Sequence, residues 1–222
     1  MPPLPPIYCI TLAEEPWKRV ELERHFADLS LNVNFLHGFY GITLGLKPTN
    51  PYEYDEYGHP KYIHASQVGC LLSHLMALQV ALSTEAPDFI ILEDDVELIT
   101  DFTPRFTHLL STKPESINLI NLELFDADLT NKPHEKVNDT LTRIHYPFGS
   151  AALWWRRDAA QLAVKTLRPI SHPSDIAFIH RVYPFVDVAV ANPPLIRQRS
   201  RNGSWPSTVD SGPKQDNTQL GG

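Results

Sequence analysis

The sequence predicts a single α/β domain built on a mainly parallel sheet. Residues 7–12 (IYCITL) form a short run of β-favouring side chains, and residues 16–31 follow with apolar positions at helical spacing. Residues 33–41 (VNFLHGFYG) are apolar and aromatic and end in glycine, which is typical of a second strand. This β-α-β order at the start of a chain is characteristic of parallel α/β proteins.

The alternation of strands and helices continues to about residue 200. We predict further strands over 88–93, 116–124, 149–155 and 185–196, and helices over 66–83, 102–111, 156–167 and 172–183. Segment 42–65 crowds proline, glycine and tyrosine between ordered elements, so we interpret it as a flap on the substrate side, with a surface excursion pinned by tyrosine packing as the alternative. One domain is expected over residues 1–200. Residues 201–222 are polar and turn-rich, which predicts a partly disordered tail.

The composition is that of a globular protein and argues against nucleic acid as a partner. Hydrophobic residues make up 42% and charged residues 20%, and the net charge is -7 from 26 acids and 19 bases, which repels phosphate backbones. Neither a signal peptide nor an apolar stretch of about 18 residues is recognisable in the sequence, so no transmembrane segment is expected. We therefore expect a cytoplasmic protein, either free or peripheral to a membrane. Cys9 and Cys70 lack a C-x-x-C spacing and are interpreted as buried thiols without a chemical role.

Three adjacent carboxylates, Glu93, Asp94 and Asp95, come at the end of the predicted strand 88–93. Adjacent like charges raise one another's pKa values and resist burial unless a cation lies among them. Alternation at a strand end points Glu93 and Asp95 to the same side. We therefore expect these two residues to hold Mn²⁺ or Mg²⁺, at the sheet edge where open α/β folds bind ligands. A solvated acidic turn is the alternative.

Two other features are candidates for the same cleft. Asp126 and Asp128 follow the run 116–124, whose asparagines make it look less like a central strand, so this acidic pair ranks second. In the helix 66–83, small residues including Ser73 form a ridge beside His74 that permits close approach of a backbone or a ligand. A purely structural histidine is the alternative interpretation of His74.

Seven stretches of the sequence, taken in order, match the pattern of one enzyme family. They are IYCITL with the following P-x-K-R (7–19), GFYG (38–41), SQVGCLLSHLMAL (66–78), ILEDDV (91–96), FGSAALWWRRDAAQLAV (148–164), PSDIAF (173–178) and PPLIRQRS (193–200). Together they resemble glycosyltransferase family 25, the lipooligosaccharide and collagen galactosyltransferase type. The Gly-Cys-x-x-Ser-His helix followed by Glu-Asp-Asp is the most specific part.

The resemblance implies a GT-A type, Rossmann-like fold and an inverting hexosyltransferase. A sugar such as galactose or glucose would pass from a UDP-sugar to a hydroxyl of a glycan or other acceptor, with Mn²⁺ at Glu-Asp-Asp. The residues expected at the donor are Thr11, Arg19, Ser73, His74, Glu93 and Asp94. Thr11 and Gln67 depart from the family's usual Asn and Glu, which leaves the nucleotide base and the sugar open.

Inverting transfer also needs a base that faces the acceptor hydroxyl, across the sugar from the diphosphate. Asp175 is the candidate, because it lies in the first turn of the predicted helix 172–183, where the helix N-terminus favours an ionised carboxylate. An acid that only complements the helix dipole is the alternative. Two other functions stay open: an inactive sugar-nucleotide-binding relative, and a metal-dependent nucleotidyltransferase, for which no phosphate-binding glycine loop is present.

Overall fold

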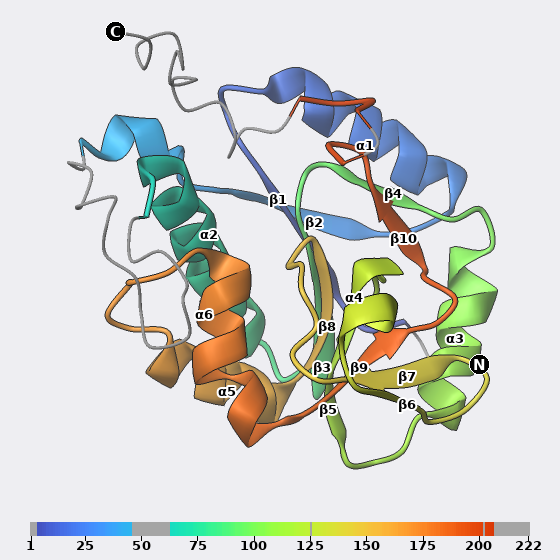
Figure 1. Cartoon of the computed structure of the whole chain (residues 1–222). Coiled ribbons are helices and arrows are strands. Elements are labelled where there is room, and N and C mark those ends of the chain that lie inside the picture. The colour runs from blue at the N-terminus through green and yellow to red at the C-terminus, as the bar shows by residue number, and fades with distance from the viewer. Residues whose placement is uncertain (1–3, 46–62, 125, 202, 207–222) are drawn as a thin grey trace, which may run out of the picture.

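A computed structural model gives the structure of this chain and describes residues 4–45, 63–124, 126–201 and 203–206. At its centre is an eight-stranded sheet in the order β2-β1-β3-β8-β5-β9-β7-β6 (Figure 1). Its strands are β1 (Ile7–Thr11), β2 (Val33–His37), β3 (Asp88–Leu92), β5 (Ile117–Asn121), β6 (His134–Lys136), β7 (Leu141–Ile144), β8 (Ala152–Arg156) and β9 (Asp187–Ala191). A separate ribbon pairs β4 (Val96–Leu98) with β10 (Ile196–Gln198).

The sheet is mixed but mainly parallel in strand direction. β1 is parallel to both β2 and β3, and β5 is parallel to β9. β8 lies antiparallel between β3 and β5, so β2, β1, β3, β5 and β9 all run the same way. The predicted α/β class is confirmed. The prediction that residues 116–124 are less central is wrong, because β5 lies inside the sheet with a buried apolar face.

Helices cover both faces of this sheet. They are α1 (Pro16–Asp28), α2 (Ala65–Leu82), α3 (Phe102–Thr112), α4 (Asp126–Asn131), α5 (Arg157–Thr166) and α6 (Ser174–Arg181), with short 3-10 helices η1 (Gly41–Leu44) and η2 (Tyr183–Phe185). In Figure 1, α1 and α3 lie on one side, and α2, α5 and α6 lie on the other. The predicted flap falls mostly on 46–62 and the predicted tail mostly on 207–222, and both of these ranges lie outside the described residues.

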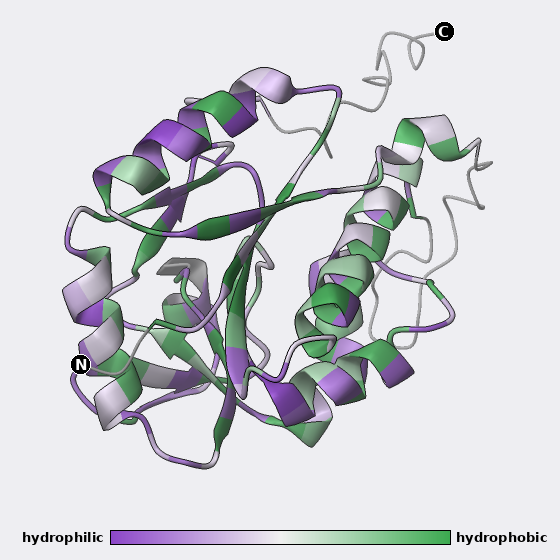
Figure 2. Ribbon diagram, turned by 180° about the vertical axis from the view of Figure 1, so that it is seen from behind, coloured by the Kyte–Doolittle hydropathy of each residue, from purple (hydrophilic) through white to green (hydrophobic). Residues whose placement is uncertain are grey.

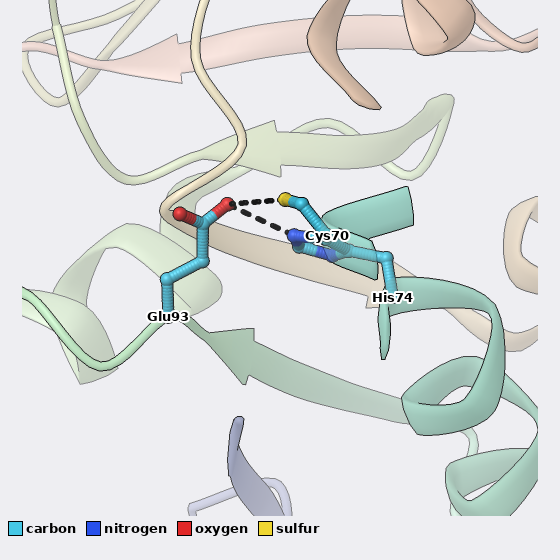
Figure 3. A group of neighbouring side chains, drawn as sticks. All are labelled: Cys70, His74 and Glu93. Atoms are coloured by element: carbon cyan, nitrogen blue, oxygen red, sulfur yellow. Dashed lines mark hydrogen bonds and ion pairs between the residues drawn. The ribbon is translucent and has the colours of Figure 1, made fainter. Parts of the chain in front are cut away.

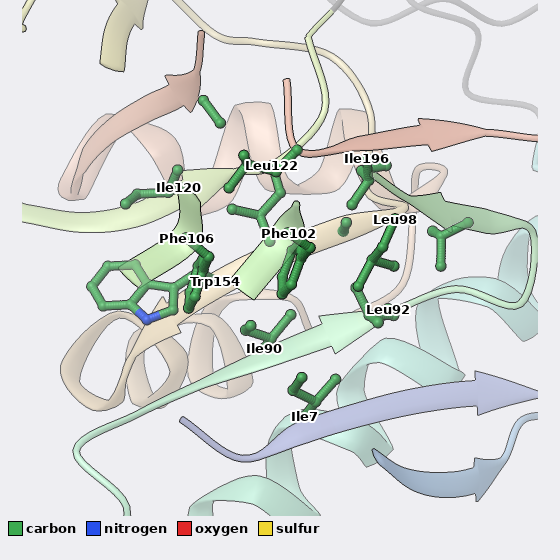
Figure 4. Close-up of a cluster of buried hydrophobic side chains, with 14 of the residues drawn as sticks. Ile7, Ile90, Leu92, Leu98, Phe102, Phe106, Ile120, Leu122, Trp154 and Ile196 are labelled. Atoms are coloured by element: carbon green, nitrogen blue, oxygen red, sulfur yellow. The ribbon is translucent and has the colours of Figure 1, made fainter. Parts of the chain in front are cut away.

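The alternation of side chains along each strand builds a separate core on each face. Ile7 and Cys9 of β1 face the cluster that contains α1 and α3, whereas Tyr8 and Ile10 face α2, α5 and α6. Trp154 of β8 joins the first cluster and packs with Phe106 of α3 (Figure 4). In Figure 2 the central strands are mostly hydrophobic, whereas the surface helices α1 and α5 carry many hydrophilic residues.

The central position of α2 sets one wall of the site. This helix is long and apolar enough to cross a membrane by length and composition, but core helices meet the same test, and α2 packs on β1, β3, α5 and α6. A Cβ atom on Gly69 would lie 2.5 Å from the carbonyl oxygen of Phe39, so only glycine lets segment 39–41 approach the helix. The predicted small-residue ridge therefore admits a neighbouring backbone.

Candidate active site

A cavity of about 390 Å³ opens at the carboxyl ends of β1 and β3. Its walls are the start of α1, segment 39–41, the first half of α2, the acids after β3, the loop before β8, the N-terminus of α6 and the segment after β10. These pieces are far apart in sequence, and they meet because parallel strands end at the same edge of the sheet. All three adjacent acids and Asp175 line this one cavity.

Glu93 is the acceptor at the centre of a hydrogen-bond network. Its Oε1 atom lies 2.9 Å from His74 Nε2 and accepts from Ser150 Oγ at 2.7 Å, while Cys70 Sγ lies 3.9 Å away (Figure 3). Burial alone would raise the pKa of Glu93, but the hydrogen bonds from His74 and Ser150 outweigh burial and hold it below the ordinary value. Glu93 is therefore an ionised carboxylate fixed in one orientation.

Asp94 is paired with a buried lysine. The Nζ atom of Lys18 lies 3.3 Å from Asp94 Oδ1 and 2.8 Å from Glu15 Oε2, and the lysine side chain is 2% exposed. Burial and the charge of Asp95 raise the pKa of Asp94 to about 7, although Lys18 opposes the rise. Asp94 can therefore gain or lose a proton close to neutral pH, beside a fixed positive charge.

Asp95 presents a carboxylate oxygen that the described part of the protein leaves unsatisfied. Its Oδ2 atom accepts a hydrogen bond from Gln198 Nε2 at 3.0 Å, but Oδ1 is buried and has no partner among the described residues. Burial and the charge of Glu93 raise its pKa, against the opposing effect of hydrogen bonds with Ser200 and Gln198. Buried carboxylate oxygens without partners are rare, and a divalent cation would satisfy this one. The donor set around Asp95 therefore fits a hard metal ion.

A second group of possible metal ligands lies in the same cavity. The ligand atoms of Cys70, His74 and Glu93 all lie within 4.8 Å of one another, and sulfur and imidazole donors suit a softer ion such as Zn²⁺. In the structure, however, Glu93 Oε1 already accepts from His74 and Ser150. The Oε1 atom of Glu93 is thus already engaged by hydrogen bonds within this group.

Asp175 enters the cavity from α6, which lies on the face of the sheet opposite to α1 and Lys18. It lies in the first turn of α6, and one of its oxygens accepts the Ile176 N–H at 2.8 Å. Burial raises its pKa, and the charge of Glu93 adds to the rise. Lys18 on α1 and Asp175 on α6 therefore bring opposite charges into one cavity from helices on opposite faces of the sheet (Figure 1).

The family follows from a comparison of sequences. The model of glycosyltransferase family 25, described as an LPS biosynthesis protein, matches residues 4–146, well over half of the chain. The chain belongs to glycosyltransferase family 25. The predicted family is confirmed, and the matched region contains Lys18, α2 and the three adjacent acids.

Two solved structures are weakly similar to this family 25 chain. A glycosyltransferase involved in the glycosylation of the major capsid of PBCV-1 is 14% identical, with 84% of this chain and 81% of that chain covered and a TM-score of 0.45. The inositol-1-phosphate CTP transferase from T. maritima is 11% identical, with 82% and 64% covered and a TM-score of 0.36. At these scores neither likeness bears on activity. No curated protein matches the chain.

The predicted donor residues of the family 25 chain divide into two groups. Ser73, His74, Glu93 and Asp94 line the cavity, as does the predicted metal ligand Asp95. Thr11 and Arg19 are absent from its lining in the described structure. Thr11 is buried with Oγ1 donating to the Leu36 carbonyl oxygen, and Arg19 pairs with Glu23 at 2.8 Å on the outer surface of α1.

The second acidic pair also lies elsewhere in the fold. Asp128 is buried in α4, where it pairs with Lys132 at 2.7 Å and accepts the Phe148 N–H at 2.9 Å. Its carboxylate is not part of the cavity lining in the described structure. The side chain of Asp126 lies outside the described residues. Asp128 thus has a structural role, anchoring the loop that leads to β8.

Several residues in the cavity were not singled out from the sequence. They are Lys18, Ser150, Ser174, Gln198 and Arg201. Four of them, Lys18, Ser150, Ser174 and Gln198, lie inside stretches that carry the family resemblance, which was a usable signal. Arg201 was assigned to the tail, yet it lines the cavity, and its charge lowers the pKa of Glu123 and Asp175 against the effect of burial.

Proposed function

We propose that this family 25 chain is an inverting glycosyltransferase of GT-A type that moves a sugar from a UDP-sugar to a hydroxyl of a glycan or other acceptor. The observation that carries the proposal is that one cavity holds Glu93, Asp94 and Asp95 from the end of β3 together with Asp175 from α6. Inverting transfer requires a base on one side of the sugar and stabilisation of the departing diphosphate on the other. Galactose and glucose are the candidate sugars.

Lys18 and Asp95 serve the leaving-group side in this proposal. Glu15 and Asp94 fix the Lys18 ammonium at 2.8 and 3.3 Å, so its positive charge is in place before any substrate arrives. Asp95, with its open Oδ1, would hold Mn²⁺ or Mg²⁺, with Glu93 beside it. When bound, the ion would neutralise charge that develops on the diphosphate.

Asp175 serves the acceptor side. Its carboxylate takes the proton from the acceptor hydroxyl while that oxygen attacks the anomeric carbon, and the diphosphate leaves with the electrons of the broken C–O bond. A pKa raised by burial brings this base closer to neutral pH, which makes proton transfer more efficient.

Ser73 and His74 act by positioning other groups. Ser73 Oγ accepts the Phe39 N–H at 2.8 Å and donates to the Gly69 carbonyl oxygen at 2.7 Å, which fixes a cavity wall against α2. His74 fixes Glu93 in the same way. Both residues therefore stabilise the donor site by holding a cavity wall and Glu93 in place.

The test is a panel of sugar nucleotides with Mn²⁺, with and without glycan acceptors, in which released UDP and pyrophosphate are measured separately. Acceptor-dependent UDP release supports the proposal. Pyrophosphate release would identify a nucleotidyltransferase, and binding without turnover would identify an inactive relative.

A cytoplasmic location, either free or peripheral to a membrane, remains part of the proposal.

A further inference from the structure

Three side chains with different kinds of ligand atom meet in the active-site cavity, namely Cys70 and His74 of α2 and Glu93 after β3 (Figure 3). Cys70 and His74 are four residues apart, so they lie on one face of α2, and this is the spacing by which a helix supplies two ligands to zinc. Cys70 forms no disulfide. A thiol, an imidazole and a carboxylate are the ligand types of protein zinc sites. The group therefore offers three suitable ligands to one ion.

The distances in this group are close to those of a tetrahedral zinc site. Zinc–ligand bonds of about 2.0–2.3 Å at tetrahedral angles put neighbouring ligand atoms about 3.3–3.6 Å apart. Glu93 Oε1 lies 2.9 Å from His74 Nε2 and 3.9 Å from Cys70 Sγ, and all three atoms lie within 4.8 Å of one another. Side-chain shifts of about 1 Å are therefore enough to surround an ion.

The hydrogen bonds at Glu93 leave room for an ion. A carboxylate oxygen has two lone pairs, so Oε1 can keep the bond from Ser150 Oγ at 2.7 Å while the ion replaces the N–H of His74. The imidazole proton then moves to Nδ1, a buried atom that has no partner among the described residues, so no other hydrogen bond is broken. The thiol proton of Cys70 leaves to solvent. The thiolate and the ionised Glu93 together balance the charge of a divalent ion.

The cavity supplies access and an open coordination position. All three residues line it, so an ion can enter from solvent, and a water molecule can complete the four ligands. The Ser174 hydroxyl lies 3.4 Å from Cys70 Sγ and 3.0 Å from Ser150 Oγ. It can donate a hydrogen bond to the thiolate, and such outer contacts orient metal ligands.

Ligand chemistry distinguishes this group from the carboxylates around Asp95. Zinc favours sulfur and nitrogen ligands and binds a given site more tightly than manganese does, whereas carboxylate oxygens suit Mn²⁺ and Mg²⁺. We propose that Cys70, His74 and Glu93 form a Zn²⁺ site, and that zinc bound there withdraws Glu93 from the Asp95 site and so inhibits the enzyme. The inhibition rests on the proposed function, but the binding of zinc does not require turnover.

The first experiment measures zinc binding to the untagged chain without nucleotide. Calorimetry should show one tightly bound Zn²⁺, and Co²⁺, which occupies zinc sites, should give the absorption band of a thiolate bound to cobalt. Cys70→Ala should remove this band and weaken zinc binding at least about 100-fold, because loss of a mere hydrogen-bond partner of a ligand already costs about 10- to 100-fold. Alanine is the best helix former, so the melting temperature without metal should change little in α2.

Cys9→Ala is the matched control. Cys9 is the other cysteine of the sequence, and it is buried in β1 and is not part of the cavity lining in the described structure. This variant should keep both the cobalt band and the affinity for zinc. Unchanged zinc binding in Cys70→Ala, as expected if zinc binds only to surface histidines, overturns the site. Equal loss in Cys9→Ala overturns it as well.

The second experiment follows manganese. Electron paramagnetic resonance of free Mn²⁺ should show that zinc releases manganese from wild type and Cys9→Ala but not from Cys70→Ala. With zinc at ten times its dissociation constant, wild-type transfer should slow about 10-fold by mass action, and excess Mn²⁺ should restore it. Cys70→Ala should keep its own zinc-free rate.

The two experiments separate the zinc site from the reaction. Failure of bound zinc to release Mn²⁺, or of wild type to bind Mn²⁺ at all, overturns the shared use of Glu93. A cobalt band and tight zinc binding without nucleotide release from any sugar nucleotide would instead refute the proposed function and leave the zinc site standing.

Discussion

The Nε2 atom of His74 lies 2.9 Å from the Oε1 atom of Glu93, and this contact joins the core helix α2 to the acidic end of β3. Because an ionised carboxylate only accepts hydrogen bonds, Nε2 carries the proton. The His74 ring is 1% exposed and packs edge-on against Phe178 of α6 at 5.6 Å. One histidine thus couples the two sides of the cavity, the acids and the helix that carries Asp175.

His74→Ala should impair catalysis more than stability. The lost bond to a charged group costs about 1.5–3 kcal/mol of unfolding free energy, and Glu93 also loses the orientation that the histidine imposes. We expect kcat/KM to fall at least about 100-fold, as measured on protein that remains folded. The exposed His37→Ala is the control. A large drop in melting temperature with near-normal kinetics would show that His74 is only structural.

Asp95→Asn should abolish turnover without destabilising the protein. Asparagine keeps an oxygen for Gln198 and removes a buried charge whose Oδ1 has no partner among the described residues, so the melting temperature without metal should stay equal or rise. Calorimetric titration with Mn²⁺ and UDP should show binding to wild type and to the exposed control Asp101→Asn, but not to this variant. Unchanged metal-dependent binding would contradict the assignment of Asp95.

Lys18→Met and Arg19→Met form a matched pair of neighbouring substitutions. Lys18 holds Asp94 and faces the cavity, whereas Arg19 makes an exposed pair with Glu23 that is worth well under 1 kcal/mol. We expect Lys18→Met to raise the KM for the donor about 10-fold or more and Arg19→Met to leave it nearly unchanged. The measurement is initial rates over a range of donor concentrations. The reverse result would restore Arg19 as the donor residue predicted from the sequence.

The sequence was sufficient to predict most of the longer strands and the acids, because both depend on local patterns. Four apolar residues at the end of β3 are followed directly by three carboxylates, and this local pattern is enough to place the acids at the end of a strand. The β6–β7 hairpin was missed because its three- and four-residue strands are too short for a periodic pattern, and β6 is exposed throughout. The antiparallel insertion of β8 depends on strand pairing across the sheet, which no local pattern reports.

The sequence does not tell which of two adjacent residues faces the cavity, because this depends on the orientation of each helix or strand. Adjacent residues of a helix point about 100° apart, so Lys18 and Arg19 face different surroundings although their charges are equal. Adjacent strand residues face opposite sides, so Ile10 and Leu12 line the cavity while Thr11 bonds to β2. Only the packing of α1 and β1 decides between these neighbours.

The Arg143–Asp187 pair predicts a pH-dependent contribution to stability away from the site. Two hydrogen bonds from Arg143, at 2.9 and 2.7 Å, hold the pKa of Asp187 below its ordinary value. The contribution is therefore complete above about pH 4, the unfolded-state pKa, and is lost as pH falls through the lower folded-state value. Asp187→Asn should cost about 1 kcal/mol at pH 7, since both side chains are partly exposed.

Urea unfolding of wild type and Asp187→Asn at a series of pH values measures this effect. The difference in unfolding free energy should shrink steadily below pH 4. An exposed pair, Arg24 with Glu21, provides the control, because substituting Glu21 by Gln should change stability by less than about 0.5 kcal/mol at any pH. A gap for Asp187→Asn that stays constant from neutral to acidic pH would contradict the role given to the pair.

Asp175→Asn should lower kcat by about 10²- to 10⁴-fold with little change in donor affinity, because the groups that hold the diphosphate survive. The activity of wild type should fall on the acid side as Asp175 gains a proton, and burial places this limb at a higher pH than for an ordinary aspartate. That limb should be absent from the residual rate of the variant. Retention of more than about a tenth of wild-type kcat would exclude Asp175 as the base. The base would then have to be another group, since Asp94 is paired with Lys18 on the leaving-group side and Asp128 is committed to Lys132.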